Sequence, residues 1–213
     1  MDLLEAYKRN PCGTLSIPYW KNKQIQIPPN MCIVHDSDFT IDRYPEYHNE
    51  PYFRLFHPLV DIPTTILDNV SIITAKQDDI PIFVDIINRS YTDLSITLDQ
   101  LNRYTQTEVY LPELWIIAVD NTTSCVVGCG IADFDKELQE GIIEWVQVLP
   151  TYRNQKIGQH IVNELLTRLS RIAKYATVSG KVNNPTTPEM LYRKCGFTGN
   201  DVWHILTKQN NCL

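Results

Sequence analysis

The sequence predicts an α/β fold in which helices flank a β-sheet, and three observations favour it. From residue 70 onward, short apolar runs alternate with segments whose apolar residues recur at helical spacing. Two apolar runs, 114–120 and 125–134, are joined by the polar turn 121–124, a pattern typical of an antiparallel hairpin. Residues 155–174 carry one apolar stripe, as expected of a helix that packs against a sheet.

The elements are predicted in the order β-α-α-β-β-β-α-β-α-β. Residues 70–75 form the first strand, and residues 78–91 form a helix whose apolar residues share one face. Residues 97–104 form a second short helix, which Thr97 and Gln100 open as a capping box. The remaining elements are predicted as strands at 114–120, 125–134, 141–149, 176–182 and 202–208 and as helices at 155–174 and 187–194.

Residues 1–65 differ from the rest of the chain. They contain eight of the thirteen prolines and five of the eleven tyrosines. Proline at this density disfavours long helices and central strands, whereas the aromatic content is unlike that of a disordered linker. We therefore expect an ordered, loop-rich N-terminal arm packed on a main domain that comprises residues 66–213.

The composition is that of a water-soluble globular protein. The chain has 213 residues, of which 43% are hydrophobic and 21% charged. Its net charge of −6 argues against nonspecific binding to nucleic acid and is compatible with a cationic substrate such as an amine. The acidic residues at the start argue against a signal peptide, and no run of eighteen apolar residues predicts a membrane span. The six cysteines form no Cys-x-x-Cys pair, so we expect free thiols and a cytoplasmic protein without membrane contact.

The connection between the strand 141–149 and the helix 155–174 has the features of a phosphate-binding loop. The strand ends at Pro150, and the loop that follows carries Arg153, Lys156 and Gly158. Amides in the first turn of a helix lack intrahelical partners and carry partial positive charge, so a pyrophosphate can accept their hydrogen bonds. The alternative is an ordinary basic connection, since the chain contains neither Gly-x-x-x-x-Gly-Lys-Ser/Thr nor Gly-x-Gly-x-x-Gly.

A second motif lies about thirty residues downstream. Asn184-Pro185 precedes a short predicted helix that ends in the run 191–197, Leu-Tyr-Arg-Lys-Cys-Gly-Phe. Together with the upstream Arg-x-x-x-x-Gly, this segment resembles the GNAT superfamily of acyl-CoA-dependent N-acyltransferases over roughly residues 70–208. The loop motif of that family reads Gln/Arg-x-x-Gly-x-Gly/Ala. Arg153 and Gly158 match its ends, and Lys156 stands where the first glycine usually is.

The resemblance implies a mixed, mostly antiparallel sheet whose fourth and fifth strands, 141–149 and 176–182, splay apart around the pantetheine arm of acetyl-CoA. It further implies transfer of the acetyl group to a primary amine of a small molecule or peptide, by direct attack in a ternary complex. The alternative is a non-catalytic CoA-binding sensor or scaffold. Two features favour it: Lys156, and a gap from Asn184 to Tyr192 that is one residue longer than usual. We expect no metal, and a monomer or homodimer.

By the same resemblance, the cofactor-binding residues are predicted to be Gln147, Val148, Leu149, Arg153, Asn154, Gln155, Lys156, Ile157, Gly158, Gln159 and Asn184. Lys156 either contacts a phosphate, crowds the phosphate path or is a solvated loop lysine. Asn184 either hydrogen-bonds CoA or fixes its own loop.

Two residues are predicted to act on protons. In the family, the Tyr of the Leu-Tyr pair protonates the leaving thiolate, a role that falls here on Tyr192 unless it is a structural tyrosine. Glu144 is the first candidate for the base, because strand alternation places its side chain on the same face as that of Val148, four residues later. It can instead be a solvent-facing glutamate, and Glu140 and Asp133 are lesser candidates.

The sequence gives weaker evidence for an acceptor site and for a metal site. The family's acceptor pocket corresponds to residues 88–110 and 198–203, with the arm proposed to close one side. Its candidate wall residues, each of which can instead belong to the core, are Tyr91, Tyr104, Tyr110 and Trp203. The arm contains His35, Asp36, Asp38, Asp42, His48 and His57. Because no His-x-x-x-His spacing occurs among them, we interpret them as surface residues and not as metal ligands.

Overall fold

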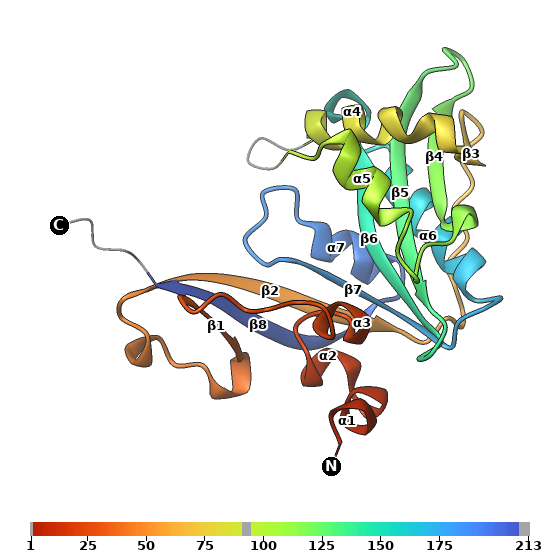
Figure 1. The fold of residues 1–213 in the computed structure, drawn as a ribbon. Helices are drawn as coiled ribbons and strands as arrows, with labels where there is room; N and C mark the ends of the chain where they lie inside the picture. Colours follow the sequence, from red (N-terminus) through yellow and green to blue (C-terminus); the bar gives the residue numbers. More distant parts are fainter. Residues whose placement is uncertain (1, 91–94, 209–213) are drawn as a thin grey trace. The chain divides into compact units, whose positions relative to one another are not determined.

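The computed structural model describes residues 2–90 and 95–208 (Figure 1). The contacts divide the chain into two units. The terminal unit comprises Met1–Phe56, Thr177–Arg193 and Phe197–Leu213, and the central unit comprises His57–Ala176 and Lys194–Gly196. We describe each unit separately. The predicted division into an arm of residues 1–65 and a domain of residues 66–213 stays a prediction.

The predicted α/β class is confirmed, with a mixed sheet of eight strands and flanking helices. Its strand order is β1-β8-β2-β7-β6-β5-β4-β3, and β7 (Tyr175–Lys181) contributes two residues to the central unit and five to the terminal unit. The other strands are β1 (Met31–His35), β2 (Tyr47–His57), β3 (Val70–Thr74), β4 (Trp115–Asp120), β5 (Val126–Asp135), β6 (Glu140–Val148) and β8 (Thr198–Lys208). The helices are α1 (Leu3–Arg9), α2 (Pro11–Thr14), α3 (Tyr19–Asn22), α4 (Ile80–Ser90), α5 (Leu98–Tyr104), α6 (Ile157–Leu169) and α7 (Pro188–Lys194).

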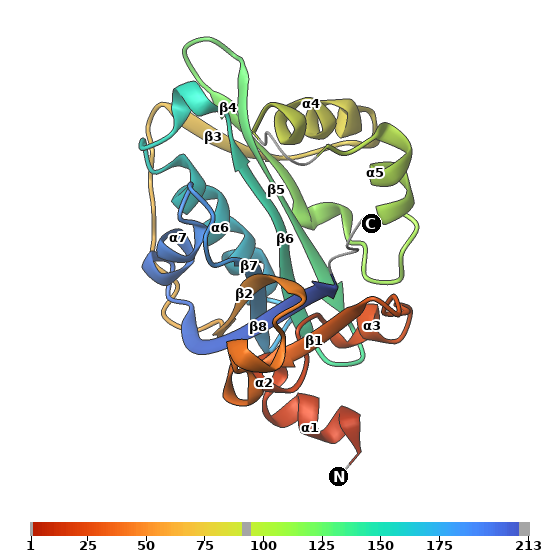
Figure 2. The ribbon, with the colours of Figure 1, turned by 90° about the vertical axis from the view of Figure 1, so that its left-hand side faces the viewer.

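In the central unit, β3, β4, β5 and β6 pair antiparallel in succession, and helices cover both faces of these strands (Figure 2). One face packs against α4 and α5, as shown by a buried cluster that joins Phe83 and Leu101 to Trp115 and Ile131. The other face packs against α6. The predicted hairpin 114–134 is thereby confirmed as β4 and β5.

Glycines on the second face allow α6 to lie close to the strands. A Cβ added at Gly130 would lie 2.5 Å from Cγ2 of Ile161, and one added at Gly141 would lie 2.6 Å from Cδ1 of Leu169. Both distances are shorter than any ordinary carbon–carbon contact. The missing side chains are therefore what permits this helix–sheet spacing.

In the terminal unit, β8 pairs antiparallel with β1 and with β2. The expectation that prolines exclude a central strand from residues 1–65 is wrong, since β2 contains Pro51 and lies between β8 and β7. Pro51 lacks an N–H group, but its carbonyl accepts a hydrogen bond from the Val182 amide at 3.0 Å, an ordinary length for such a bond. The loss of one donor is thus tolerated within an otherwise paired strand.

Several element boundaries differ from the prediction. The helix predicted over 155–174 spans only Ile157–Leu169, because Lys156 has a left-handed backbone with φ of 62° and the chain tightens into turns after Leu169. The last strand begins at Thr198, four residues earlier than predicted. The helix predicted over 78–91 begins with a 3₁₀ turn and becomes α4 at Ile80. The capping box at Thr97 and Gln100 is confirmed at the start of α5.

Candidate donor site and surrounding residues

The loop between β6 and α6 contains two left-handed residues in close succession. A 3₁₀ turn over Pro150–Tyr152 follows the end of β6. Asn154 and Lys156 then adopt φ angles of 63° and 62°, and α6 begins at Ile157. The Lys156 side chain makes no capping hydrogen bond to this helix. The start of α6 therefore combines a sharply turned loop with first-turn amides that the N-cap side chain does not cover, a geometry suited to an anion.

Arg153 contacts the main chain of two other elements. Its Nε donates a hydrogen bond to the Val148 carbonyl at 3.3 Å, and its Nη2 donates to the Ser90 carbonyl at 3.1 Å. Val148 ends β6 and Ser90 ends α4. Arg153, predicted to add charge at the loop, therefore also has a structural role, because part of its guanidinium binds these two carbonyls.

The end of β6 presents side chains on both faces. Gln147 pairs in register with Cys129, which belongs to the core beneath α4. The Val148 side chain lies on the opposite face, where it and Ile161 of α6 surround the position of Gly128. The first four residues of β6 are buried, whereas Glu144–Val148 are all partly exposed. Of the three residues predicted to line the pantetheine arm, Gln147 and Val148 therefore belong to the accessible end of this strand, whereas Leu149 follows it and is 7% exposed in the core.

A β-bulge falls at Glu144. Trp145 pairs with Ile131 and Ile143 pairs with Ala132, so that Glu144 has no partner position on β5. The bulge interrupts the two-residue alternation. The argument that Glu144 and Val148 share a face therefore fails, since it assumed an unbroken strand. Bulges re-aim side chains and are frequent beside active sites, so Glu144 keeps its interest as a half-buried carboxylate at the start of the accessible segment.

The lesser candidates for the base lie at the other end of β6. Glu140 pairs in register with Asp135, and Asp133 pairs with Ile142, next to the β5–β6 turn. Eight residue steps separate Glu140 from Val148, roughly 26 Å at about 3.3 Å per residue. This separation argues against a direct role for Glu140 or Asp133 at the end of β6.

Tyr192 and Asn184 belong to the terminal unit. Tyr192 is 7% exposed, and its ring centroid lies 6.2 Å from that of Phe53 and 5.7 Å from that of Phe197. Asn184 fixes its own loop, because its Oδ1 accepts hydrogen bonds from the Thr186 amide at 2.9 Å and from Thr186 Oγ1 at 2.7 Å. Tyr192 thus packs in an aromatic cluster, and the loop-fixing interpretation of Asn184 gains support.

The predicted acceptor residues have different surroundings. Tyr104 is 42% exposed on α5, and the ring of Tyr110 meets that of Trp115 edge-on at 5.5 Å. Burial, with a smaller effect of Glu113, raises the pKa of Tyr110. Trp203, in the terminal unit, donates from Nε1 to the Cys12 carbonyl at 2.8 Å. Tyr91 lies outside the described residues.

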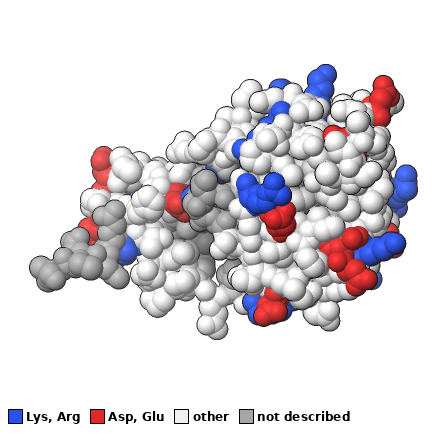
Figure 3. Space-filling view, turned by 90° about the horizontal axis from the view of Figure 1, so that it is seen from above, with Lys and Arg blue, Asp and Glu red and all other residues white. Residues whose placement is uncertain are grey.

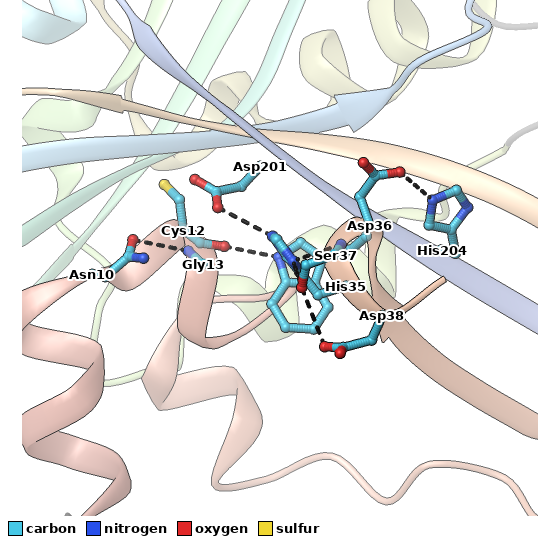
Figure 4. A network of polar contacts seen from close by, with 10 residues as sticks. Asn10, Cys12, Gly13, His35, Asp36, Ser37, Asp38, Asp201 and His204 are labelled. Atoms are coloured by element: carbon cyan, nitrogen blue, oxygen red, sulfur yellow. Dashed lines mark hydrogen bonds and ion pairs between the residues drawn. The ribbon is translucent and has the colours of Figure 1, made fainter. Parts of the chain in front are cut away.

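His35 and Asp36 of the arm each make a polar contact with a residue of β8 (Figure 4). His35 Nε2 lies 3.1 Å from Asp201, and His204 Nε2 lies 3.0 Å from Asp36, so that two His–Asp pairs connect residues 35–36 to β8. Within residues 2–90 and 95–208, no three His, Cys, Asp or Glu side chains are placed to hold a metal ion.

His57 is separate from those pairs and lies in the central unit. It is 1% exposed, and its Nδ1 accepts a hydrogen bond from the Leu59 amide at 2.9 Å. Burial lowers the pKa of His57, although a hydrogen bond with the Cys195 main chain acts in the opposite direction. The interpretation of His57 as a surface residue is therefore wrong, because its imidazole is buried in the core of this unit.

The surface gives no sign of a charged patch on the face shown in Figure 3, where described Lys and Arg side chains are scattered and several lie beside Asp or Glu. None of the helices in the described part of the chain has the length and apolar content needed to cross a membrane.

One stretch of the chain matches a known family model. Residues 112–199 match the family model described as an acetyltransferase (GNAT) domain. A search of curated proteins gives no match. Among solved structures, a GCN5-related N-acetyltransferase from Sphaerobacter thermophilus aligns with a TM-score of 0.69 at 17% identity, over 87% of this chain and 62% of that one. This chain therefore spans less than two thirds of that protein.

Two further structures cover a smaller part of this chain but nearly all of their own. The ribosomal-protein-S18-alanine N-acetyltransferase from Escherichia coli has a TM-score of 0.52 at 18% identity, over 68% of this chain and 98% of that one. A chain of the NatC complex bound to Gag peptide and CoA has a TM-score of 0.53 at 17% identity, over 67% and 99%. At these identities the likeness shows the fold.

Proposed function

Because residues 112–199 of this chain match the family model of a GNAT acetyltransferase domain, we propose that the protein is an acyl-CoA-dependent N-acetyltransferase. It transfers acetyl from acetyl-CoA to a primary amine of a small molecule or peptide, in a ternary complex, in the cytoplasm and as a monomer or homodimer. The observation that carries the proposal is the start of α6, where left-handed Asn154 and Lys156 open a helix directly after the accessible end of β6.

The donor is held mainly by main-chain groups. The amides of Ile157, Gly158 and Gln159 bind the diphosphate, because first-turn amides have no acceptor within the helix. The pantetheine arm lies along the end of β6, at Gln147–Leu149. The side chains of the loop contribute charge and hydrogen bonds from Asn154, Gln155, Lys156 and the remaining donors of Arg153, and Asn184 acts through its loop.

The reaction needs a base for the amine and an acid for the leaving group. Glu144 accepts one proton of the attacking ammonium, directly or through water, so that the free amine forms the new C–N bond as the C–S bond breaks, and the nitrogen then releases its second proton to solvent. Tyr192 donates its hydroxyl proton to the departing sulfur and regains one from solvent. Support for these roles comes from the place of Glu144 in the partly exposed segment of β6 and from the position of Tyr192 in the Leu-Tyr-x-Lys-x-Gly-Phe run.

Thiol release from acetyl-CoA, measured against a panel of small and peptide amines, tests the proposal. We expect amine-dependent release, lowered at least tenfold in Tyr192→Phe with CoA affinity little changed. Unchanged turnover in this variant would refute the role of Tyr192. For Glu144→Gln, a pH–rate profile that keeps the acidic limb of the native enzyme would exclude Glu144 as the base.

A non-catalytic CoA-binding module is the second candidate. Lys156 at the family's glycine position and the long gap between Asn184 and Tyr192 favour it. Tight CoA binding without thiol release for any amine would support this function over acetyl transfer.

A further inference from the structure

Arg153 joins the donor loop to the C-terminal end of α4. Its two hydrogen bonds reach the Val148 carbonyl at 3.3 Å and the Ser90 carbonyl at 3.1 Å. Ser90 is the last residue of α4, where carbonyls lack intrahelical partners and carry partial negative charge. A guanidinium suits both needs, because its planar donors can satisfy two acceptors in different directions while its charge favours the helix end.

The end of α4 is itself tied to the start of α5. Asn88 Nδ2 donates to the Ile96 carbonyl at 2.9 Å, and Asn88 Oδ1 accepts from the Ile96 amide at 2.7 Å. Ile96 is 5% exposed and directly precedes the capping box at Thr97. Arg153 therefore connects the donor loop by hydrogen bonds to a frame made by the end of α4 and the start of α5, beside the apolar packing of Leu149 and Tyr152 on the core beneath α4.

We propose that Arg153 is a positioning residue that couples occupation of the donor loop to the order of this α4–α5 frame. The inference rests on the proposed function for the identity of the ligand. CoA binding restricts the loop that carries Arg153, which strengthens its hold on Ser90. Because such coupling is reciprocal, an ordered end of α4 in turn favours CoA binding. When the donor is bound, the loop therefore orders the end of α4 and the start of α5, which lie on the same face of the sheet as Gln147.

Hydrogen exchange of residues 86–90 and 96–98, measured with and without CoA, tests the coupling. In the wild-type protein we expect CoA to slow exchange at these amides about fivefold or more, within the range usual for coupled sites. In Arg153→Ala, CoA affinity measured by calorimetry should fall about fivefold or more, as reciprocal coupling requires, and the added protection should be lost at CoA concentrations that saturate each protein. Arg153→Lys should restore part of it, since an ammonium can hold one carbonyl.

Arg89→Ala is the matched control. Arg89 lies next to Ser90 and pairs with Asp85 at 2.9 Å on the exposed face of α4, so this variant removes an arginine without removing the Arg153 bonds. Its CoA affinity and CoA-induced protection should equal those of the wild-type protein. Equal loss of protection in Arg89→Ala would overturn the proposal.

Two further outcomes would overturn it. If Arg153→Ala keeps the full CoA-induced protection, no coupling passes through Arg153. If it keeps this protection while losing more than about tenfold in CoA affinity but none for pantetheine, Arg153 acts only as a phosphate ligand. If CoA does not bind the wild-type protein, the proposed function is wrong. The positioning role of Arg153 is then tested by comparing the exchange rates of the variants without ligand. Faster exchange at residues 86–90 in Arg153→Ala than in Arg89→Ala supports the positioning role, and equal rates reject it.

Discussion

Lys156 adopts a backbone conformation that favours glycine. The residue adopts a φ of 62° and a ψ of 8°, in the left-handed region that glycine enters without steric cost. A side chain there costs on the order of 1–2 kcal/mol. The lysine at the motif's glycine position is visible in the sequence, whereas its left-handed backbone conformation is visible only in the structure.

Substitution at residue 156 should follow this conformation. We expect Lys156→Gly to leave the free energy of unfolding unchanged within about 1 kcal/mol, because relief of strain offsets the greater freedom of glycine in the unfolded chain. Lys156→Val should lower it by about 1–2 kcal/mol, because branched side chains tolerate this region poorly. Urea unfolding measures both. Gln155→Val, one residue earlier, is the control, and an equal loss there would contradict the explanation.

Arg54 is a second residue whose role depends on three-dimensional contacts. It is 1% exposed in the terminal unit, and its Nη2 donates to the Tyr7 hydroxyl at 2.7 Å. Tyr7→Phe removes an acceptor from a buried charged group, so we expect the free energy of unfolding to fall by about 1.5–3 kcal/mol. Tyr104→Phe, at an exposed tyrosine, should change it by less than about 0.5 kcal/mol. Similar effects of the two variants would rule out the assigned role of the Tyr7–Arg54 contact.

At the scale of elements, the packing of α6 on β5 depends on a missing side chain. Gly130→Ala would place a methyl group 2.5 Å from Ile161 Cγ2, so we expect a loss of about 1–3 kcal/mol in stability from overpacking. Ile161→Ala frees this space and should therefore cost less in the Gly130→Ala background than alone. A double-mutant cycle measured by denaturant unfolding gives the coupling. A coupling of zero would show that the two residues do not compete for space.

Elements with local signals were predictable from the sequence, and those without were not. The capping box at Thr97 and the hairpin turn 121–124 depend on neighbouring residues, and both are confirmed. The strand β2 depends on pairing with β8, about 150 positions away in the chain, for instance Tyr52 with Trp203, which leaves no local pattern. The bulge at Glu144 is likewise unmarked by glycine or proline.

The same distinction holds for the candidate site. The start of α6 was predictable, because a proline, basic residues and a glycine mark the change from strand to helix. The inward contacts of Arg153 were not, because they depend on the end of α4, more than sixty residues earlier in the chain.

At the scale of the whole molecule, stability should depend on pH through His57. Burial lowers the pKa of this histidine, so the unfolded chain binds its proton at a higher pH than the folded protein does. The contribution of His57 is therefore complete above about pH 6.5 and is lost as the pH falls below that value, with a slope of at most about 1.4 kcal/mol per pH unit. Urea unfolding between pH 7.5 and 5 should show a smaller decline for His57→Gln than for the wild-type protein. Parallel declines would contradict a buried neutral His57.

The structure also changes how the role of the N-terminal arm can be tested. Removal of residues 1–60 would remove β1 and β2, and β2 lies between two other strands. We expect such a truncated protein to lose the cooperative unfolding of its C-terminal strand, as measured by near-UV circular dichroism. The proposal that the arm closes the acceptor cleft is better tested by single substitutions at exposed residues of the arm.

The position of β8 in the sheet has a consequence during synthesis on the ribosome. β2 ends at His57, but the strand that pairs with it along its length begins only at Thr198. At about 5–20 residues per second, the nascent chain displays these N-terminal strands without that neighbour for on the order of ten seconds. Unpaired strands of this kind are exposed to aggregation, and closure over so long a chain segment is slow. We expect newly made molecules to depend on chaperones until β8 leaves the exit tunnel.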